Sequence, residues 1–229
     1  MAKLILVRHG QSTYNLEGKF TGWTDVDLSP KGIDEAKNTA TVLQKNKISV
    51  DICFSSYLKR AIKTAWVILE QMDMMHVDHY HSWKLNERHY GQWQEKNKEE
   101  VKNQLTHDEY EAIHRGNDIP PPALDANDKR HPKFDPKYKK INPDFLPTAE
   151  SLSDTEKRVV NYYFEHIVPC LMQDANVLVS AHGNSLRALM EHLQSIDARK
   201  ISELEVPTGK PYLYEYDNQL NLLDHGIIK

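Results

Sequence analysis

The sequence predicts an α/β fold built on a mostly parallel sheet. Two short aliphatic runs, residues 4–7 and 176–181, have the length and composition of strands that are buried on both faces of such a sheet. A histidine and then a glycine follow each run, with His9 after the first and His182 after the second. Ligands of open α/β sheets bind outside the carboxyl ends of the strands, so we expect both imidazoles to meet at one ligand.

Length and composition indicate one domain spanning residues 1–229. Of the 229 residues, 39% are hydrophobic and 27% are charged, an ordinary balance for a globular protein. The formal net charge is −4, so neither a nucleic acid nor a membrane is an expected partner. The two cysteines form no Cys-x-x-Cys pair, and the amino-terminal apolar run is too short for a signal peptide. We therefore expect a cytoplasmic protein.

A polar loop, residues 11–28, follows the first strand and carries Ser12, Asn15, Thr21 and Gly22. Hydroxyl groups and glycines in this place can bring backbone amides close to an anion. The alternative is an ordinary loop, because loops are rich in these residues in general.

Two helices are expected next. Residues 30–45 begin at a Ser-Pro pair and repeat apolar residues at helical spacing. Residues 51–55 form another strand, after which Ser56 is expected to cap a second helix. Arg60 lies in the first turn of this helix, off its apolar stripe, where it can reach the same crevice as Arg8. The alternative is a solvated surface arginine.

A histidine-rich segment, residues 76–81, raises the question of a metal site. His79 and His81 share one face of a strand, but Asp78 points to the other face and no cysteine lies nearby. We favour a half-exposed strand and expect no metal.

The segment 85–91 places four different reactive groups in consecutive positions, Glu87 to Tyr90. A carboxylate in a crevice lined by arginine is a candidate general acid and base, so Glu87 is a candidate catalytic residue. The alternative is a salt-bridged turn.

Residues 92–147 have the composition of an inserted cap. Residues 96–114 show a helical pattern, and seven prolines then exclude long helices and central strands. The segment has too few apolar residues for a core of its own, so we expect it to cover the crevice. A disordered linker is the alternative.

The last third of the chain completes the α/β pattern. Ser151 is expected to cap a helix over residues 152–168, and another helix should follow His182 over residues 185–194. A short helix near 198–204 and two strands, 212–216 and 220–223, complete the prediction.

These residues together indicate phosphoryl transfer. Arg8 beside His9 disfavours a metal and favours a phosphate. A neutral His9 can accept a phosphoryl group as a nucleophile, while His182, with Arg8 and Arg60, stabilises the transition state. Glu87 would exchange a proton with the hydroxyl group.

Seven motifs in order resemble the cofactor-dependent phosphoglycerate mutases of the histidine phosphatase superfamily, and they span nearly the whole chain. Leu-Val-Arg-His-Gly resembles the signature of the superfamily, and the other six motifs are more specific to the mutases. The motifs occupy residues 6–10, 20–23, 27–29, 58–61, 85–91, 181–189 and 207–209.

This resemblance implies a three-layer α/β sandwich that interconverts 3-phosphoglycerate and 2-phosphoglycerate. It implies 2,3-bisphosphoglycerate as the primer, no metal, and a homodimer or homotetramer. By resemblance His9 is the phosphorylated nucleophile, Glu87 the proton donor and acceptor, and His182 the partner of the phosphoryl group. The implied phosphate and substrate contacts are Arg8, Ser12, Asn15, Thr21, Gly22, Arg60, Arg88, His89, Tyr90, Lys98, His114, Arg115, Gly183 and Asn184.

Three departures from the family pattern concern retention of the primer. Glu95 stands three residues before Lys98, His114 replaces the first of two paired arginines, and the carboxyl tail is short. The first two changes remove positive charge, so we predict weaker retention of 2,3-bisphosphoglycerate and more hydrolysis than in typical members.

Two other functions remain open from the sequence. A histidine phosphatase would use the same His9 but release phosphate from small phosphorylated metabolites to water. A non-catalytic phospho-ligand binder would keep the pocket without turnover, although such a protein needs no nucleophile.

Overall fold

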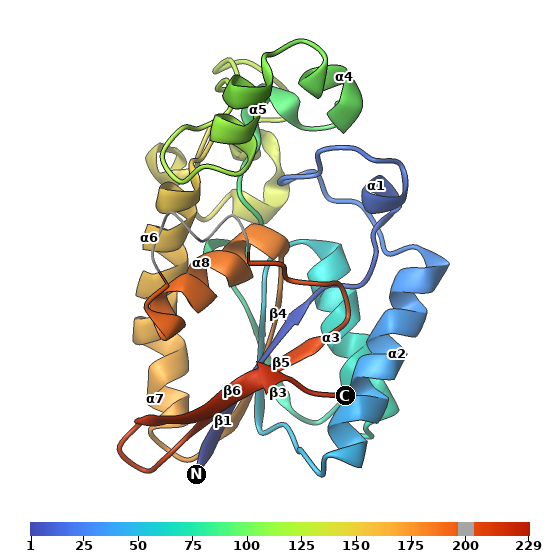
Figure 1. The fold of residues 1–229 in the computed structure, drawn as a ribbon, viewed down its shortest axis with the longest axis vertical. Coiled ribbons are helices and arrows are strands. Elements are labelled where there is room, and N and C mark those ends of the chain that lie inside the picture. The colour runs from blue at the N-terminus through green and yellow to red at the C-terminus, as the bar shows by residue number, and fades with distance from the viewer. Residues whose placement is uncertain (197–203) are drawn as a thin grey trace.

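The computed structural model, which describes residues 1–196 and 204–229, has a mixed sheet at its centre (Figure 1). In the described residues the strand order is β3-β2-β4-β1-β5-β6. The first four strands in this order are parallel to one another, β5 runs antiparallel to β1, and β6 runs antiparallel to β5. The strands are β1 (Ala2–Arg8), β2 (Ile52–Ser55), β3 (Asp78–His81), β4 (Asn176–Ala181), β5 (Pro211–Tyr216) and β6 (Leu222–Ile227).

Helices cover both faces of this sheet, which gives the expected three layers (Figure 1). On one side lie α2 (Pro30–Lys45) and α3 (Lys59–Gln71), which pack against each other. On the other side lie α6 (Leu152–Tyr162), α7 (Val168–Leu171) and α8 (Gly183–Gln194). The three-layer α/β prediction is confirmed.

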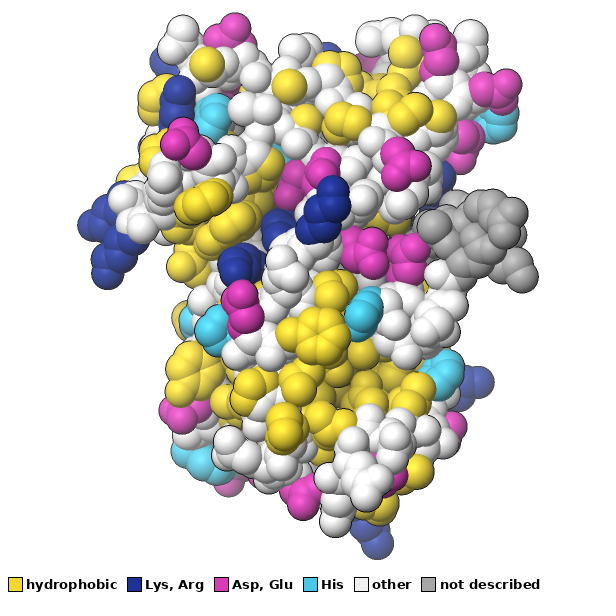
Figure 2. All heavy atoms as spheres, turned by 90° about the vertical axis from the view of Figure 1, so that its left-hand side faces the viewer, with side chains coloured by type: hydrophobic (Ala, Val, Ile, Leu, Met, Phe, Trp, Pro, Cys, Tyr) yellow, Lys and Arg dark blue, Asp and Glu magenta, His cyan; other side chains and the backbone are white. Residues whose placement is uncertain are grey.

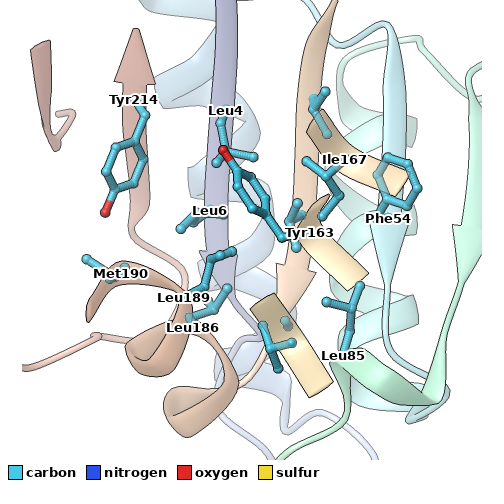
Figure 3. Packing of buried hydrophobic residues seen from close by; sticks show 14 of the residues in the cluster. Leu4, Leu6, Phe54, Leu85, Tyr163, Ile167, Leu186, Leu189, Met190 and Tyr214 are labelled. Atoms are coloured by element: carbon cyan, nitrogen blue, oxygen red, sulfur yellow. The ribbon is translucent and has the colours of Figure 1, made fainter. Parts of the chain in front are cut away.

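Alternate residues of the central strands build two separate cores. Leu4 and Leu6 of β1 point into the layer of α6 and α8, where Leu186 and Tyr163 join them (Figure 3). Ile5 and Val7 belong to the other core, with residues of α2 and α3. This period of two explains why both faces of β1 are apolar.

Two of the predicted helices are interrupted in the structure. The expected helix at 96–114 is divided into α4 (Lys98–Lys102) and α5 (His107–His114), because Thr106 and Glu109 form a capping box that starts a new helix. The helix expected at 152–168 passes through a π-helical turn at Tyr163–Ile167 before α7. Pro169 has no N–H to continue the α-helical hydrogen bonds.

The carboxyl-terminal hairpin is shifted toward the end of the chain. Its second strand occupies Leu222–Ile227, because Leu220 adopts a left-handed conformation in the turn, with φ 61°. The short helix expected near 198–204 falls mainly on residues outside the described ones. Within the described ranges, no helix is both long and apolar enough to cross a bilayer.

The segment 92–147 packs on the rest of the chain through aromatic contacts. Trp93 and Tyr110 join Phe20 in one small cluster, and Tyr138 stacks on Trp23 at 5.2 Å in another. Figure 1 shows α4 and α5 at the same end of the molecule as α1 (Thr13–Leu16), which lies in the polar loop after β1.

Candidate active site

The two strand-end histidines lie against each other. β1 and β4 are parallel neighbours, and the His9 amide donates a hydrogen bond to the Ala181 carbonyl at 3.0 Å. The ring centroids of His9 and His182 are 5.0 Å apart, with an edge-on arrangement at 61°. The geometry therefore matches the pairing expected from the two strand ends.

His9 presents one free ring nitrogen beside a cation. Its Nδ1 donates to the Gly10 carbonyl at 2.7 Å, because a carbonyl oxygen can only accept, and this leaves the lone pair on Nε2. Arg60 Nε points at that lone pair from 3.2 Å. Burial, and then the charges of Arg60 and Arg8, hold the pKa of His9 well below its usual value. A neutral imidazole with an available Nε2 can act as a nucleophile.

Arg60 is fully buried and is not a solvated surface arginine. Its guanidinium donates to the carbonyls of Gly22 at 2.8 Å and Thr24 at 3.0 Å, which ties the start of α3 to the polar loop. Burial lowers the pKa of Arg60 to about 10, so it still carries its charge at neutral pH.

His182 is held from behind by Ser56. The Ser56 hydroxyl lies 2.7 Å from His182 Nε2 and also accepts a hydrogen bond from the Leu58 amide. The prediction that Ser56 caps α3 is wrong, because Leu58 occupies the N-cap position. Burial, and then Arg60 and His9, hold the pKa of His182 well below its usual value, so the ring is neutral in the free protein.

Glu87 faces the pocket from a segment without regular secondary structure, after the short turn Trp83–Leu85. One carboxylate oxygen, Oε1, accepts hydrogen bonds from the amides of Arg88 at 2.9 Å and Asn184 at 3.0 Å. Among the described residues, no partner is recorded for Oε2. One oxygen is therefore fixed while the other can exchange a proton with a ligand.

Most of the predicted site residues line a single pocket. Its wall carries six cationic side chains against one carboxylate, Glu87, which suits a strongly anionic ligand. The Nε of Arg8 is buried without a hydrogen-bond partner among the described residues, as expected of a donor that awaits an anion. The predicted residues in the wall are Arg8, His9, Asn15, Thr21, Gly22, Arg60, Glu87, Tyr90, Lys98, His114, Arg115, Gly183 and Asn184.

Sequence reasoning missed Lys19, Phe20 and Arg187, which also line the pocket. The sequence could have predicted Arg187 as a site residue, because it lies one helical turn after Asn184 in the motif at residues 181–189. Its guanidinium donates to the Asn184 side chain at 2.9 Å and to the Leu204 carbonyl at 3.0 Å.

Ser12, Arg88, His89 and the predicted catalytic residue His182 lie outside the wall of the pocket. The Ser12 side chain caps α1. His89 is fully buried, and its Nδ1 accepts from the Gly91 amide at 3.1 Å. Arg88 is 1% exposed, and its guanidinium donates hydrogen bonds to four main-chain carbonyls. Ser12, Arg88 and His89 therefore shape the site from behind its wall, and His182 reaches it through its contact with His9.

The two charge departures have different outcomes. Glu95 does not line the pocket, and its carboxylate accepts a hydrogen bond from the Thr24 hydroxyl at 3.4 Å. Its negative charge acts on Lys19, which lines the pocket, so a weaker hold on the primer stays a prediction for Glu95. His114 does line the pocket. Burial, followed by the charge of Arg115, lowers the pKa of His114 to about 3, so it contributes no positive charge at neutral pH.

In the part of the chain that the structure describes, no group of three or more His, Cys, Asp or Glu side chains is placed to hold a metal ion. His79 and His81 lie on the edge strand β3, with ring centroids 4.2 Å apart. His79 Nε2 bonds the Ser55 hydroxyl at 2.9 Å.

The family model of the histidine phosphatase superfamily, branch 1, matches residues 4–225. The chain belongs to this superfamily. A curated relative from Nautilia profundicola, a 2,3-bisphosphoglycerate-dependent phosphoglycerate mutase, is 46% identical over 222 residues, which cover 97% of each chain.

Two solved structures share the fold at low sequence identity. A phosphoserine phosphatase from Entamoeba histolytica, in complex with 3-phosphoglyceric acid, superimposes with a TM-score of 0.69 at 19% identity, over 100% of this chain and 98% of that one. An α-ribazole phosphatase from Shigella flexneri gives 0.68 at 22% identity, over 96% and 95% of the two chains.

Proposed function

We propose that this chain interconverts 3-phosphoglycerate and 2-phosphoglycerate through a phosphohistidine on His9, primed by 2,3-bisphosphoglycerate. The single observation that carries the proposal is that His9, in contact with His182, lines a pocket with six cations and one carboxylate. The 46% identity to a curated mutase over nearly the whole chain supports the same reaction.

In this mechanism the free hydroxyl group of phosphoglycerate gives its proton to the Glu87 carboxylate, and its oxygen takes the phosphoryl group from phosphorylated His9, which forms 2,3-bisphosphoglycerate. His9 Nε2 then attacks the phosphorus atom of the other phosphate, and the bond from that phosphorus to the substrate oxygen breaks. The electron pair stays on that oxygen, which takes a proton from Glu87. Arg8 and Arg60 neutralise charge on the phosphoryl oxygens. The anionic phosphoryl group also favours protonation of His182, which then stabilises the transition state.

The other half of the pocket would hold the carboxylate and the second phosphate. Lys98, Arg115 and Arg187 supply charge there, and Tyr90 and Asn184 supply hydrogen bonds. The Asn184 amide group already donates to the Tyr90 hydroxyl at 3.0 Å. When bound, 2,3-bisphosphoglycerate supplies the phosphoryl group that makes His9 competent, and the unpaired Arg8 Nε fits such an anion.

A coupled mutase assay with and without 2,3-bisphosphoglycerate tests this function. Wild type should isomerise phosphoglycerate, depend on the primer, and carry acid-labile phosphate, whereas His9→Ala should do none of these. Absence of isomerisation with brisk phosphate release would favour a phosphatase. Absence of acid-labile phosphate on His9 would favour a non-catalytic binder.

Hydrolysis of the phosphohistidine is the second candidate activity, and the neutral His114 favours it. One cation fewer in the distal half of the pocket weakens retention of a bisphosphorylated intermediate. Phosphate release measured beside isomerisation gives the balance of the two activities.

We further propose a cytoplasmic homodimer or homotetramer. Tyr80 on the edge strand β3 and Phe164 near α7 are each about half exposed. Figure 2 shows hydrophobic side chains gathered on the lower half of the face that carries α6 and α7. Light scattering coupled to gel filtration measures the assembly state, and a monomer would contradict this proposal.

A further inference from the structure

The backbone that carries Glu87 is held by a buried ion pair outside the pocket. Arg158 of α6 and Glu150, which precedes that helix, are 8% and 4% exposed. Two parallel hydrogen bonds join them, from Nε to Oε1 at 2.6 Å and from the second terminal nitrogen to Oε2 at 2.8 Å. Such two-pronged pairs fix both the distance and the plane of the guanidinium.

The three remaining donors of Arg158 all bind main-chain carbonyls of the Glu87 segment. They reach Lys84 at 2.8 Å, Asn86 at 2.9 Å and Glu87 itself at 3.0 Å. All five N–H groups of the guanidinium are therefore used. The segment after Leu85 has no helix or strand to satisfy the carbonyls of Asn86 and Glu87, so side chains supply the partners: Arg158 binds both, and Trp23 Nε1 also donates to the Glu87 carbonyl.

Glu150 holds the same segment from its other end. Its Oε2 accepts from the His89 amide at 2.8 Å, and its own amide donates to the His89 carbonyl at 2.9 Å. The Glu150 carbonyl accepts from Arg88 Nε at 2.7 Å. The pair thus bonds the backbone on both sides of the Glu87 side chain.

Neither member of the pair is built to bind the ligand. Both lie outside the wall of the pocket, and the charge of one cancels the charge of the other. We propose that Arg158, oriented by Glu150, is a positioning residue that sets the Glu87 carboxylate for proton transfer; this inference rests on the proposed function for the role of Glu87. The Glu87 carboxylate accepts hydrogen bonds from the Asn184 amide and from the Arg88 amide, and the Arg88 amide belongs to the backbone that Arg158 and Glu150 hold.

The experiment compares two phosphoryl donors with different leaving groups. Transfer from 2,3-bisphosphoglycerate expels an alkyl alcohol, which needs the proton of Glu87. Transfer from 4-nitrophenyl phosphate expels 4-nitrophenol, a much more acidic alcohol that leaves without one. The measured quantity is the rate of His9 phosphorylation in the first turnover, by rapid quench for the first donor and by absorbance for the second.

Arg158→Lys keeps the charge but loses the planar fork. A misplacement of about 1 Å costs about 10²-fold in rate, so we expect a loss of that size with 2,3-bisphosphoglycerate and little loss with 4-nitrophenyl phosphate. Glu87→Gln should show the same pattern, with a loss of about 10²–10⁴-fold for the first donor. The double variant should be no slower than Glu87→Gln alone.

Arg130→Lys is the matched control, because Arg130 also forms a two-pronged pair, with Asp128, and bonds a carbonyl, that of Gln94. Its ratio between the two donors should equal that of wild type. If Arg158→Lys fails to fold, as judged by circular dichroism, Glu150→Gln tests the same ratio with an isosteric side chain.

Equal losses with both donors, or a ratio no different from the Arg130→Lys control, would overturn the proposal. Failure of the proposed function is distinct from this result. Wild type would then accept phosphate from both donors without isomerising phosphoglycerate, and the ratio would still be measurable.

Discussion

Replacing Arg60 by methionine tests how the pocket prepares His9. After burial, the Arg60 charge is the largest cause that lowers the pKa of His9. Methionine fills similar space without the charge or the donor, so the pKa of His9 should rise toward its usual value. Since only neutral His9 can attack, activity should then be lost at a higher pH as the solution is acidified.

The structure also sets the size of the rate loss. Arg60 Nε lies 3.2 Å from His9 Nε2, the atom that receives the phosphoryl group in the proposed mechanism. Two unit charges about 4 Å apart interact by about 4 kcal/mol at the effective dielectric of a protein site. Since about 1.4 kcal/mol corresponds to a tenfold change, Arg60→Met should slow phosphorylation by about 10³-fold. Arg60→Lys should lose less, because it keeps the charge.

The assay is the first-turnover rate of His9 phosphorylation between about pH 5 and 8, the range in which imidazoles ordinarily titrate. Circular dichroism confirms that the variants are folded. A loss of less than about tenfold, or an acid limb at the same pH as in wild type, would refute the reasoning.

Three further predictions follow from single positions. In Gly22→Ala the new Cβ would lie 2.4 Å from the Gln94 side chain, at a residue whose φ is 52°, so Tm should fall. Gly18→Ala is the control, because φ there is 67° but the space around the new Cβ is open. Equal falls in Tm for the two variants would contradict the clash. His114→Arg should retain 2,3-bisphosphoglycerate more tightly and release less phosphate per isomerisation, and an unchanged phosphate release would exclude His114 as the cause. Burial lowers the pKa of His89 and of His114 to about 3, so their contribution to the free energy of unfolding is complete above about pH 6.5 and is lost as the pH falls toward 3. Each histidine changes the free energy of unfolding by up to about 1.4 kcal/mol per pH unit in this range. Urea unfolding of His114→Gln should therefore show a shallower pH dependence than wild type.

The strand ends and the paired histidines are predictable because their physics is local. A short aliphatic run, followed at once by a polar residue and glycine, marks both a buried strand and its carboxyl edge. The start of α2 follows in the same way from Ser29 and Pro30. These local signals place His9 and His182 before any contact between them is known.

The environment of the arginines is not predictable from local pattern. Arg60 and Arg88 have the sequence context of surface residues, yet both are almost fully buried, because carbonyls from distant loops satisfy them. The same holds for Arg158, which the helical pattern of α6 leaves unmarked. Every residue has a main-chain carbonyl, so the residue type of the partner does not reveal that an arginine binds it.

The binding of arginine to main-chain carbonyls affects which residues of the cap, residues 92–147, can change during evolution. Arg88 holds the carbonyls of Ile113, His114 and Ile119, and these oxygens exist whatever side chain is attached to them. The side chains that the cap presents to the ligand can therefore change while its hydrogen bonds to Arg88 are kept. An imidazole in place of a guanidinium at position 114 is the kind of change that this arrangement permits, and it would allow catalytic balance to drift while the architecture stays constant.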